Sequence, residues 1–336
     1  MDKTRAQHSQ NLYHQVTIGQ KIIAGNLWLA PVAGYSDFAF RSLCVEQGAS
    51  LTCTELVSSE ALVRGSAKTA LLLKRADTEK HWAVQLFGSS AAVMAQAALA
   101  LAPFKPDSVD INAGCPVPKV VKTGAGAALM RTPLLLGQIV ASVVQASEAA
   151  LGAVPVTVKL RSGWDESSIN YAECAHAAGD SGAALVSLHP RTRAQGYAGT
   201  SCWQHIADLV SRISIPVAGS GDLFSPPEAE RMLCQTGCAA LLFARGALGN
   251  PFIFSATKAL LLAQSSSPPT PEIICAAGVR HLCLLAESYG ERAACCMMRK
   301  HFCAYSKGLA GGSALRQRLV RASSIQEYRT ILMVSD

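Results

Sequence analysis

The chain has 336 residues, of which 50% are hydrophobic and 16% are charged, and its formal net charge is +7. This composition excludes an intrinsically disordered chain, which has too few apolar residues to form a core. No uncharged apolar run approaches the roughly 20 residues of a membrane helix, and residues 1–20 lack the apolar stretch of a secretory signal, so we expect a cytoplasmic protein without membrane contact. The basic excess is compatible with a polyanionic partner.

The twelve cysteines are scattered without the regular spacing of a disulfide framework, which indicates reduced thiols. They also form no metal-binding motif. Cys234 and Cys238 are four residues apart, Cys295 and Cys296 are adjacent, and no Cys-x-x-Cys pair occurs. We therefore expect no metal site.

Eight short apolar runs of β type follow one another along the first three quarters of the chain. Most are continuous rather than alternating, which is typical of parallel strands buried on both faces. Segments long enough for helices, such as 91–102 and 134–150, separate them. Eight strand–helix units predict a (β/α)8 barrel. A doubly wound open sheet is the alternative, although no Gly-x-Gly-x-x-Gly opens the first unit. The predicted strands are 27–33, 51–56, 82–87, 108–114, 155–161, 184–189, 215–221 and 240–246.

The composition changes after Ala247. Residues 265–271, Ser-Ser-Ser-Pro-Pro-Thr-Pro, are typical of a linker, and the remainder predicts helices with a break at 308–312. We expect a barrel domain over 1–255 and a helical domain over 256–336. Residues 292–326 contain seven Lys or Arg and no Asp or Glu. Such a segment can be only a solvated surface, but its length without an acid favours contact with a phosphate backbone.

Polar residues stand at the carboxyl end of almost every predicted strand, where barrels of this kind collect their functional groups. The fourth run ends in Asn112-Ala-Gly-Cys115-Pro116. The glycine permits a tight turn and the proline fixes the backbone just beyond the thiol, so Asn112 and Cys115 reach the same rim. These residues alone are compatible with a reactive thiol or with a small buried cysteine.

Lys159 lies inside an apolar run, and an unpaired buried ammonium costs several kcal/mol. An anionic position of a reduced flavin would compensate it, with Gln85 bound to the same ring system. A salt bridge to Glu55 or Asp110 is the alternative.

The seventh and eighth runs end in turns that contain glycine, 219–222 and 244–246, and the loops after these two strands commonly bind phosphate. Arg245 and backbone amides there can hold a phosphate monoester, although turns without a ligand are the alternative. After the seventh run, residues 225–228, Ser-Pro-Pro-Glu, predict a helix start with Ser225 as N-cap. His189 is either a neutral core histidine or an anion contact, and the basic loop after it favours the second.

Ten segments carry a resemblance in sequence order from about residue 27 to about residue 321. They include Ala-Pro-Val-Ala-Gly at 30–34, Asp-Ile-Asn-Ala-Gly-Cys-Pro at 110–116, Val-Thr-Val-Lys-Leu-Arg at 156–161, His-Pro-Arg-Thr-Arg at 189–193, Gly-Ser-Gly-Asp at 219–222, Ala-Arg-Gly-Ala-Leu-Gly-Asn-Pro at 244–251 and Met-Arg-Lys-His at 298–301. As an ordered set, they resemble the tRNA-dihydrouridine synthase family in its bacterial, B-like form.

The resemblance implies an FMN-containing barrel followed by a helical tRNA-binding domain, with NADPH as reductant and no stable protein partner. It implies hydride transfer from the flavin to C6 of a uracil, with Cys115 as the catalytic cysteine that protonates C5. The implied cofactor-binding residues are Pro31, Val32, Ala33, Gln85, Lys159, His189, Ser220, Gly221, Asp222, Ala244 and Arg245. The implied substrate-binding residues are Asn112, Lys119, Arg161, Arg191, Arg193, Arg299 and Lys300.

Three positions depart from the family pattern. Val32 stands where Met is common, Ser220 where Asn is usual and Ala244 where Gly is usual. Two alternative functions are an FMN-dependent reductase of a free pyrimidine or another small unsaturated substrate, and an RNA-binding protein that has lost its flavin. The first has no need of the basic helical segment.

Overall fold

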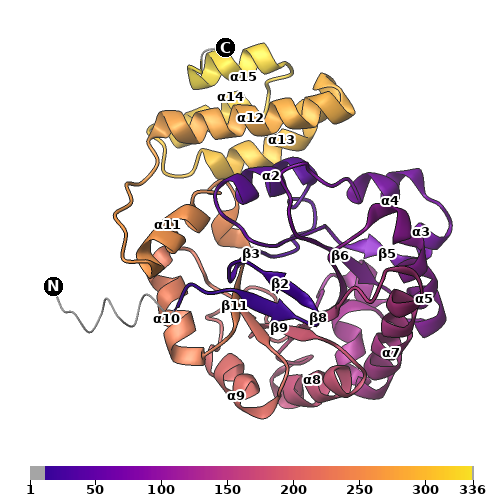
Figure 1. Cartoon of the computed structure of the whole chain (residues 1–336). Coiled ribbons are helices and arrows are strands. Elements are labelled where there is room, and N and C mark those ends of the chain that lie inside the picture. The colour runs from indigo at the N-terminus through magenta and orange to yellow at the C-terminus, as the bar shows by residue number, and fades with distance from the viewer. Residues whose placement is uncertain (1–11, 335–336) are drawn as a thin grey trace.

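Eight parallel strands form a barrel with helices around it (Figure 1). The structure, a computed structural model, describes residues 12–334. The ring closes at a parallel bridge between Trp28 and Leu51. The predicted (β/α)8 barrel and all eight strand positions are confirmed. The barrel strands are β3 (Leu27–Leu29), β4 (Thr52–Cys53), β6 (Trp82–Phe87), β7 (Ser108–Ala113), β8 (Val156–Arg161), β9 (Leu185–His189), β10 (Val217–Ser220) and β11 (Ala240–Phe243), and β5 (Val57–Ser58) pairs with β6.

The connecting segments form the outer helices, because their apolar faces are buried against the barrel. The predicted helices at 91–102 and 134–150 are α5 and α7. The helices are α2 (Phe38–Glu46), α3 (Ser59–Val63), α4 (Ala67–Leu72), α5 (Ala91–Ala100), α6 (Pro118–Val121), α7 (Pro133–Ala150), α8 (Tyr171–Asp180), α9 (Gln204–Arg212), α10 (Pro226–Thr236) and α11 (Ile253–Leu261), with short 3-10 helices η1 (Ala102–Phe104), η2 (Gly126–Arg131), η3 (Glu166–Ser168) and η4 (Arg245–Ala247).

Helix α7 is, by length and composition alone, apolar enough to cross a membrane. In this fold the apolar residues of α7 pack against the barrel, and Leu136, Ile139 and Val143 belong to the barrel core. The start of α10 at Pro226 agrees with the prediction, but Ser225 makes no capping hydrogen bond. The Glu228 carboxylate instead accepts from the Phe224 amide at 2.7 Å.

An antiparallel hairpin that the sequence did not predict closes one end of the barrel. Strands β1 (Val16–Ile18) and β2 (Lys21–Ile23) pair across a two-residue turn. Their side chains form an apolar cluster with Trp28 and with residues at the amino ends of β9, β10 and β11. Figure 1 shows β2 lying across the centre of the ring. The hairpin therefore seals the amino end, and the carboxyl ends of the strands stay open.

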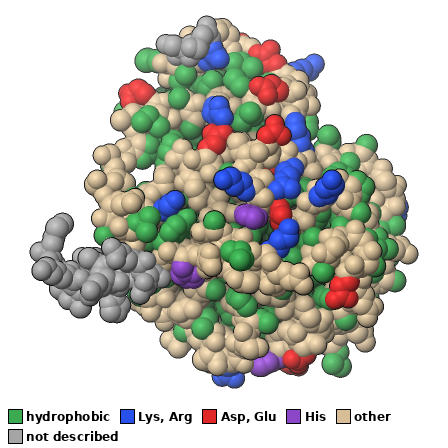
Figure 2. All heavy atoms as spheres, in the orientation of Figure 1, with side chains coloured by type: hydrophobic (Ala, Val, Ile, Leu, Met, Phe, Trp, Pro, Cys, Tyr) green, Lys and Arg blue, Asp and Glu red, His purple; other side chains and the backbone are tan. Residues whose placement is uncertain are grey.

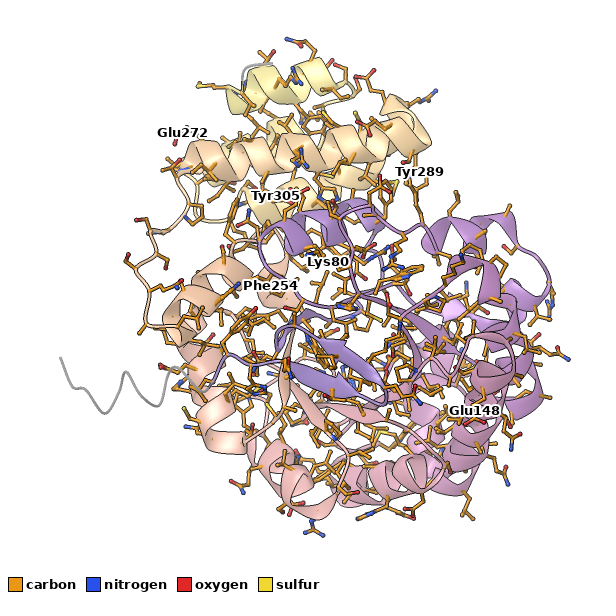
Figure 3. All side chains as sticks on the ribbon, viewed as in Figure 1. Lys80, Glu148, Phe254, Glu272, Tyr289 and Tyr305 are labelled. Carbon is orange, nitrogen blue, oxygen red and sulfur yellow. The ribbon has the colours of Figure 1, made fainter. Side chains whose placement is uncertain are left out.

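Four helices follow the barrel and rest on α2. The predicted linker and the predicted break before residue 312 are confirmed. The apolar core of these helices includes Leu282, Phe302 and Tyr328 and is continuous with Phe38 of α2. Figure 3 shows Tyr305 on the side of this bundle that faces the barrel. The helices are α12 (Pro271–Tyr289), α13 (Glu291–Tyr305), α14 (Gly312–Leu319) and α15 (Ile325–Leu332).

The loop after β11 approaches α13 very closely. Gly249 has φ +70°, and a Cβ atom there would lie 2.5 Å from the Tyr305 amide nitrogen, so only glycine fits. Helix α11 crosses the expected domain boundary at residue 255, and its Phe254 and Leu261 belong to the barrel core. The boundary itself stays a prediction.

Replacing Glu79 by alanine is expected to lower the free energy of unfolding by about 3–5 kcal/mol, because it leaves a guanidinium buried without its partner. Arg41 Nε donates to Glu79 Oε1 at 2.7 Å, and both side chains are at most 1% exposed. Urea denaturation measures the change. The control, Glu60→Ala, breaks an exposed pair with Arg64 and should cost less than about 0.5 kcal/mol. Equal losses in the two variants would contradict the prediction.

Candidate functional site

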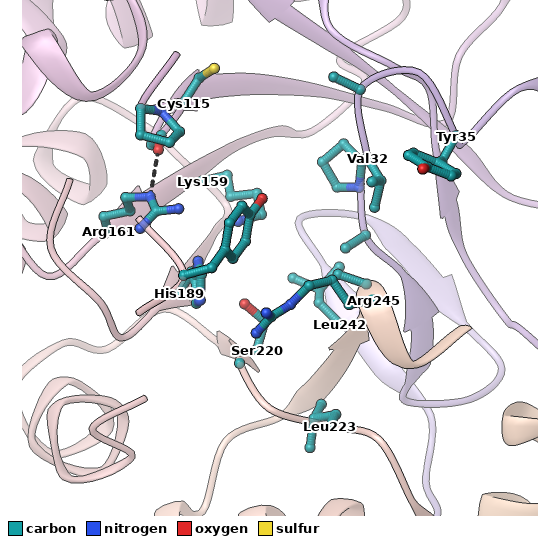
Figure 4. A pocket seen from close by; sticks show the side chains of 18 of the residues that line it. Val32, Tyr35, Cys115, Lys159, Arg161, His189, Ser220, Leu223, Leu242 and Arg245 are labelled. Atoms are coloured by element: carbon teal, nitrogen blue, oxygen red, sulfur yellow. Dashed lines mark hydrogen bonds between the residues drawn. The ribbon is translucent and has the colours of Figure 1, made fainter. Parts of the chain in front are cut away.

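A cavity of about 440 Å³ opens at the carboxyl ends of the barrel strands (Figure 4), which is within the size range of cofactor sites. In Figure 4, Val32 and Tyr35 face Cys115, Lys159 and Arg161 across it. Parallel strands bring their carboxyl ends to one rim, so residues far apart in sequence meet here. The predicted site residues that line the cavity are Pro31, Val32, Ala33, Asn112, Cys115, Lys159, Arg161, His189, Ser220, Gly221, Asp222, Ala244 and Arg245.

The Cys115 thiol stands on a turn that Asn112 holds. The Asn112 side-chain oxygen accepts hydrogen bonds from the amides of Gly114 at 3.2 Å and Cys115 at 2.8 Å. A Cβ atom on Gly114 would come within 3.3 Å of the Leu160 backbone, so the turn packs tightly on β8. Burial raises the pKa of the Cys115 thiol, against smaller opposing effects of a backbone amide and nearby cations. The thiol is therefore protonated at neutral pH.

Gln85 lies behind the cavity and does not line it. It is fully buried, its amide nitrogen donates to Asp110 Oδ2 at 2.5 Å, and its oxygen accepts from Asn112 Nδ2 at 2.8 Å. Asp110 also accepts from the Thr157 hydroxyl at 2.5 Å. Burial raises the pKa of Asp110, and these hydrogen bonds oppose the shift. A chain of hydrogen bonds thus runs from Thr157 through Asp110 and Gln85 to the turn that carries the thiol.

Within residues 12–334, the Lys159 ammonium makes no hydrogen bond or ion pair. The salt bridge that the sequence left open is not formed, because Asp110 is bonded to Thr157 and Gln85, and the Glu55 carboxylate accepts from the Gly34 amide. Burial, followed by repulsion from Arg161, lowers the pKa of Lys159 to about 8. An unpaired cation beside an apolar cavity is a site for an anionic or electron-rich group.

Asp222 organises the opposite side of the cavity. Its carboxylate accepts from Arg191 at 2.7 Å, from Arg245 at 2.9 Å and from the Ser201 amide at 2.8 Å. Partial burial opposes its ionisation, but the hydrogen bonds from Arg191 and Ser201 hold the pKa of Asp222 below its ordinary value. Gly221, with φ +108°, and Asp222, with φ +57°, form the turn that presents this carboxylate. Asp222 therefore fixes Arg245 rather than facing the cavity as a free charge.

The Arg191 side chain is buried and bonded within the protein. It is 2% exposed, and its guanidinium also donates to the carbonyls of Ala198 and Gly199. His189 lies beside it, and burial together with Lys159 and neighbouring guanidiniums lowers the pKa of His189 to about 2. His189 is thus a neutral imidazole on the cavity wall. Arg161 is also buried, and it donates to the carbonyls of Gly114, Thr192 and Gly196 while lining the cavity.

Tyr197 is a cavity residue that the sequence analysis did not single out. Its ring is 58% exposed. The guanidinium of Arg245 lies 4.7 Å from its centroid, and that of Arg161 lies 5.7 Å away. An aromatic residue in a loop rich in glycine and arginine was the only signal in the sequence. The exposed ring is suited to stacking on a planar ligand.

The remaining predicted contacts lie outside the cavity. Lys119 is exposed on α6, and Arg299 is exposed on α13. Arg193 lies 4.6 Å above the ring of Trp164, and the Lys300 ammonium lies 5.3 Å from the ring of Tyr35. Figure 2 shows Lys and Arg side chains, mixed with acidic ones, along the band where the helices meet the barrel.

A family model described as dihydrouridine synthase matches residues 28–334. The chain belongs to the dihydrouridine synthase family. A relative from Treponema pallidum, named a probable tRNA-dihydrouridine synthase, is 50% identical over 326 residues and 96% of each chain. The tRNA-dihydrouridine synthase B of Pseudomonas aeruginosa is 36% identical over 308 residues and 91% of each chain. The family resemblance seen in the sequence is thereby confirmed.

Solved structures with this fold include other barrel enzymes. The 6-hydroxypseudooxynicotine amine oxidase of Pseudomonas geniculata matches with a TM-score of 0.59 and 16% identity, over 78% of this chain and 51% of that one. Morphinone reductase in complex with tetrahydroNAD matches with a TM-score of 0.53 and 13% identity, over 78% of this chain and 93% of that one. At these identities the likeness concerns the fold alone.

The rate of alkylation of Cys115 by iodoacetamide is expected to rise with pH and to reach half its maximum above pH ~8.5, the ordinary value for a thiol. The reason is that burial raises its pKa and only the thiolate reacts. Mass spectrometry of the peptide that contains Cys115 follows the reaction, and the exposed Cys296 in the same digest verifies the reagent. A rate that is already maximal at pH 7 would show a thiolate instead.

Proposed function

We propose that this protein is a tRNA-dihydrouridine synthase, which reduces the C5–C6 double bond of uridine in tRNA with FMN as bound cofactor and NADPH as reductant. The observation that carries the proposal is a cavity lined by both the unpaired Lys159 ammonium and the Cys115 thiol. Membership of the family, and relatives named tRNA-dihydrouridine synthase, support the same function.

The residues of the cavity fit FMN. Ala30, Pro31 and Leu242 form an apolar wall against which a flat ring can lie. Lys159 offers the unpaired positive charge that an electron-rich ring edge needs, and Arg245 with the adjacent turn offers a place for the phosphate. When bound and reduced by NADPH, FMN supplies the hydride for C6 of the uracil. Gln85 does not line the cavity, but it would act on the flavin site indirectly, because it accepts a hydrogen bond from Asn112.

Two departures from the family pattern are compatible with this fit. Ser220 is buried, and its hydroxyl donates to the Leu188 carbonyl at 3.3 Å, so the shorter side chain is satisfied within the barrel. The Ala244 methyl group packs against an apolar cluster of the barrel, and the residue lines the cavity. Neither residue therefore conflicts with a bound flavin.

Cys115 acts in this proposal as the general acid. Addition of hydride at C6 leaves negative charge at C5 and O4, and the Sγ proton neutralises it at C5. The raised pKa keeps that proton on sulfur until it is needed. Asn112 sets the position of the thiol, because its side-chain oxygen accepts hydrogen bonds from the amides of Gly114 and Cys115. Its Nδ2 group donates one hydrogen to Gln85, and the other can donate to the uracil. The exposed Tyr197 ring stacks on the base.

The tRNA substrate has to present its uridine outside the base stack, because a cavity of about 440 Å³ that also holds the flavin has no room for a duplex. We assign the phosphate contacts to Lys119 and Arg193 at the barrel rim and to Arg299 and Lys300 on α13. We assign the other five basic residues of 292–326 to the same surface. The proposed division is a catalytic barrel over 1–255 and a tRNA-binding helical domain over 256–336. A reductase of small free pyrimidines would not require such a surface.

Cys115→Ala is expected to lower the single-turnover rate of dihydrouridine formation by about 100-fold or more, since it removes the general acid. Its flavin content and its oxidation of NADPH with oxygen as acceptor should equal those of the native enzyme. Mass spectrometry of tRNA nucleosides measures the product, and visible absorbance measures the flavin. Unchanged product formation would remove Cys115 from this role, and a colourless native protein would refute the flavin assignment.

Arg299→Glu is expected to raise KM for tRNA and to reduce the salt dependence of binding, because it removes one phosphate contact. NADPH oxidation should not change, since Arg299 does not line the cavity. The matched control is Arg212→Glu, a surface change at the end of α9. If both variants bind tRNA equally well, α13 is not part of the binding surface.

A further inference from the structure

Three side chains of the kind that bind metals meet where the barrel joins the C-terminal helices. Asp37 stands at the N-cap of α2, His281 in α12 and His301 in α13. His281 Nε2 lies 3.2 Å from Asp37 Oδ1, and His301 Nε2 lies 3.2 Å from Asp37 Oδ2. One donor atom from each residue lies within 4.8 Å of the others, and all three residues are buried.

Hydrogen bonds do not account for all of these atoms. Asp37 Oδ1 is well satisfied, because it accepts from the Phe40 amide at 3.0 Å and from His281. Asp37 Oδ2 and both ring nitrogens of His301 have no hydrogen-bond partner. His301 Nε2 lies 3.2 Å from Asp37 Oδ2, but the angles of this contact are not those of a hydrogen bond. Polar atoms buried without a partner call for an explanation, and a bound ion is one.

We propose that Asp37, His281 and His301 bind a divalent transition-metal cation of the zinc type. Imidazole nitrogens and a carboxylate are ligands that this class of ion prefers. With metal–ligand bonds of about 2.0–2.1 Å in a tetrahedral site, neighbouring donor atoms are about 3.3 Å apart, which agrees with the two distances of 3.2 Å. The three residues thus supply three of the four donor atoms of such a site, and the fourth position is left for a water molecule.

The surroundings of the cluster also suit an ion. The Tyr305 hydroxyl lies 3.4 Å from His281 Nδ1, a contact that orients the ring from its far side. Tyr35 lies edge-on to His301 with ring centroids 5.2 Å apart, and Phe40 stacks on His281 at 5.8 Å. These rings help to bury the three side chains within the protein. The sequence contains no metal-binding motif for this cluster, because its three residues are far apart in sequence and stand at the N-cap of α2, in α12 and in α13.

The ion would join three elements that otherwise meet only through packing and a few hydrogen bonds. Asp37 follows the segment that lines the cavity, and Tyr35 lies both on the cavity wall and against His301. A cation here would therefore fix α12 and α13 relative to the rim of the cavity. This role is structural and does not depend on the reaction proposed above.

The experiment uses the purified full-length protein, incubated with Zn²⁺ and then dialysed. Elemental analysis is expected to find one zinc per chain. X-ray absorption at the zinc edge should show only nitrogen and oxygen neighbours at about 2.0–2.1 Å, whereas zinc on cysteines would show sulfur at about 2.3 Å. Absence of retained zinc, or a sulfur shell, would overturn the proposal and leave a metal-free hydrogen-bonded cluster.

Two variants locate the ion. His301→Gln should lose the zinc and the rise in Tm that zinc causes in the native protein. Asp37→Asn should do the same, while its side chain can still cap α2. The control is His176→Gln on the exposed face of α8, which should keep both. Far-ultraviolet circular dichroism establishes that each variant is folded. Zinc content at the native level in folded Asp37→Asn or His301→Gln would refute the assignment.

Discussion

Closure of the strand ring is the constraint on which the rest of the molecule depends. The first barrel strand pairs with the last, so that Leu29 lies beside Phe243, and the Trp28–Leu51 bridge joins the remaining gap. Closure places Pro31–Ala33 next to Ala244–Arg245, two segments from opposite ends of the barrel sequence. An open sheet would leave them on separate edges. Since the β1–β2 hairpin seals the amino end, the closed ring has a single open mouth.

The polar groups of the barrel are divided between two levels. Below the cavity, Gln85 donates a hydrogen bond to Asp110 and accepts one from Asn112. The polar groups at this level therefore bind one another and not a ligand. Around the cavity the charges are mostly positive, and Asp222 balances two of them. Lys159 is the charge that this arrangement leaves without a partner. An unpaired cation of this kind favours an electron-rich ligand.

The sequence was sufficient for the barrel because buried parallel strands appear as continuous apolar runs, and for most of the cavity because strand ends share one rim. It was insufficient where tertiary contacts decide. The burial of Arg191 could not be predicted, because it depends on an ion pair with Asp222, 31 residues away. Gln85 faces Asp110 through the register of β6 with β7, which periodicity does not reveal. The hairpin strands are three residues each, too short to give a pattern.

The close approach of Gly249 to Tyr305 sets the distance between the loop after β11 and helix α13. A Cβ atom at position 249 would lie 2.5 Å from a backbone nitrogen of α13, so any larger residue there has to push the helix away from the barrel. Helix α13 also carries Arg299 and Lys300. The missing side chain at position 249 therefore determines how near these two cations stand to the open end of the barrel.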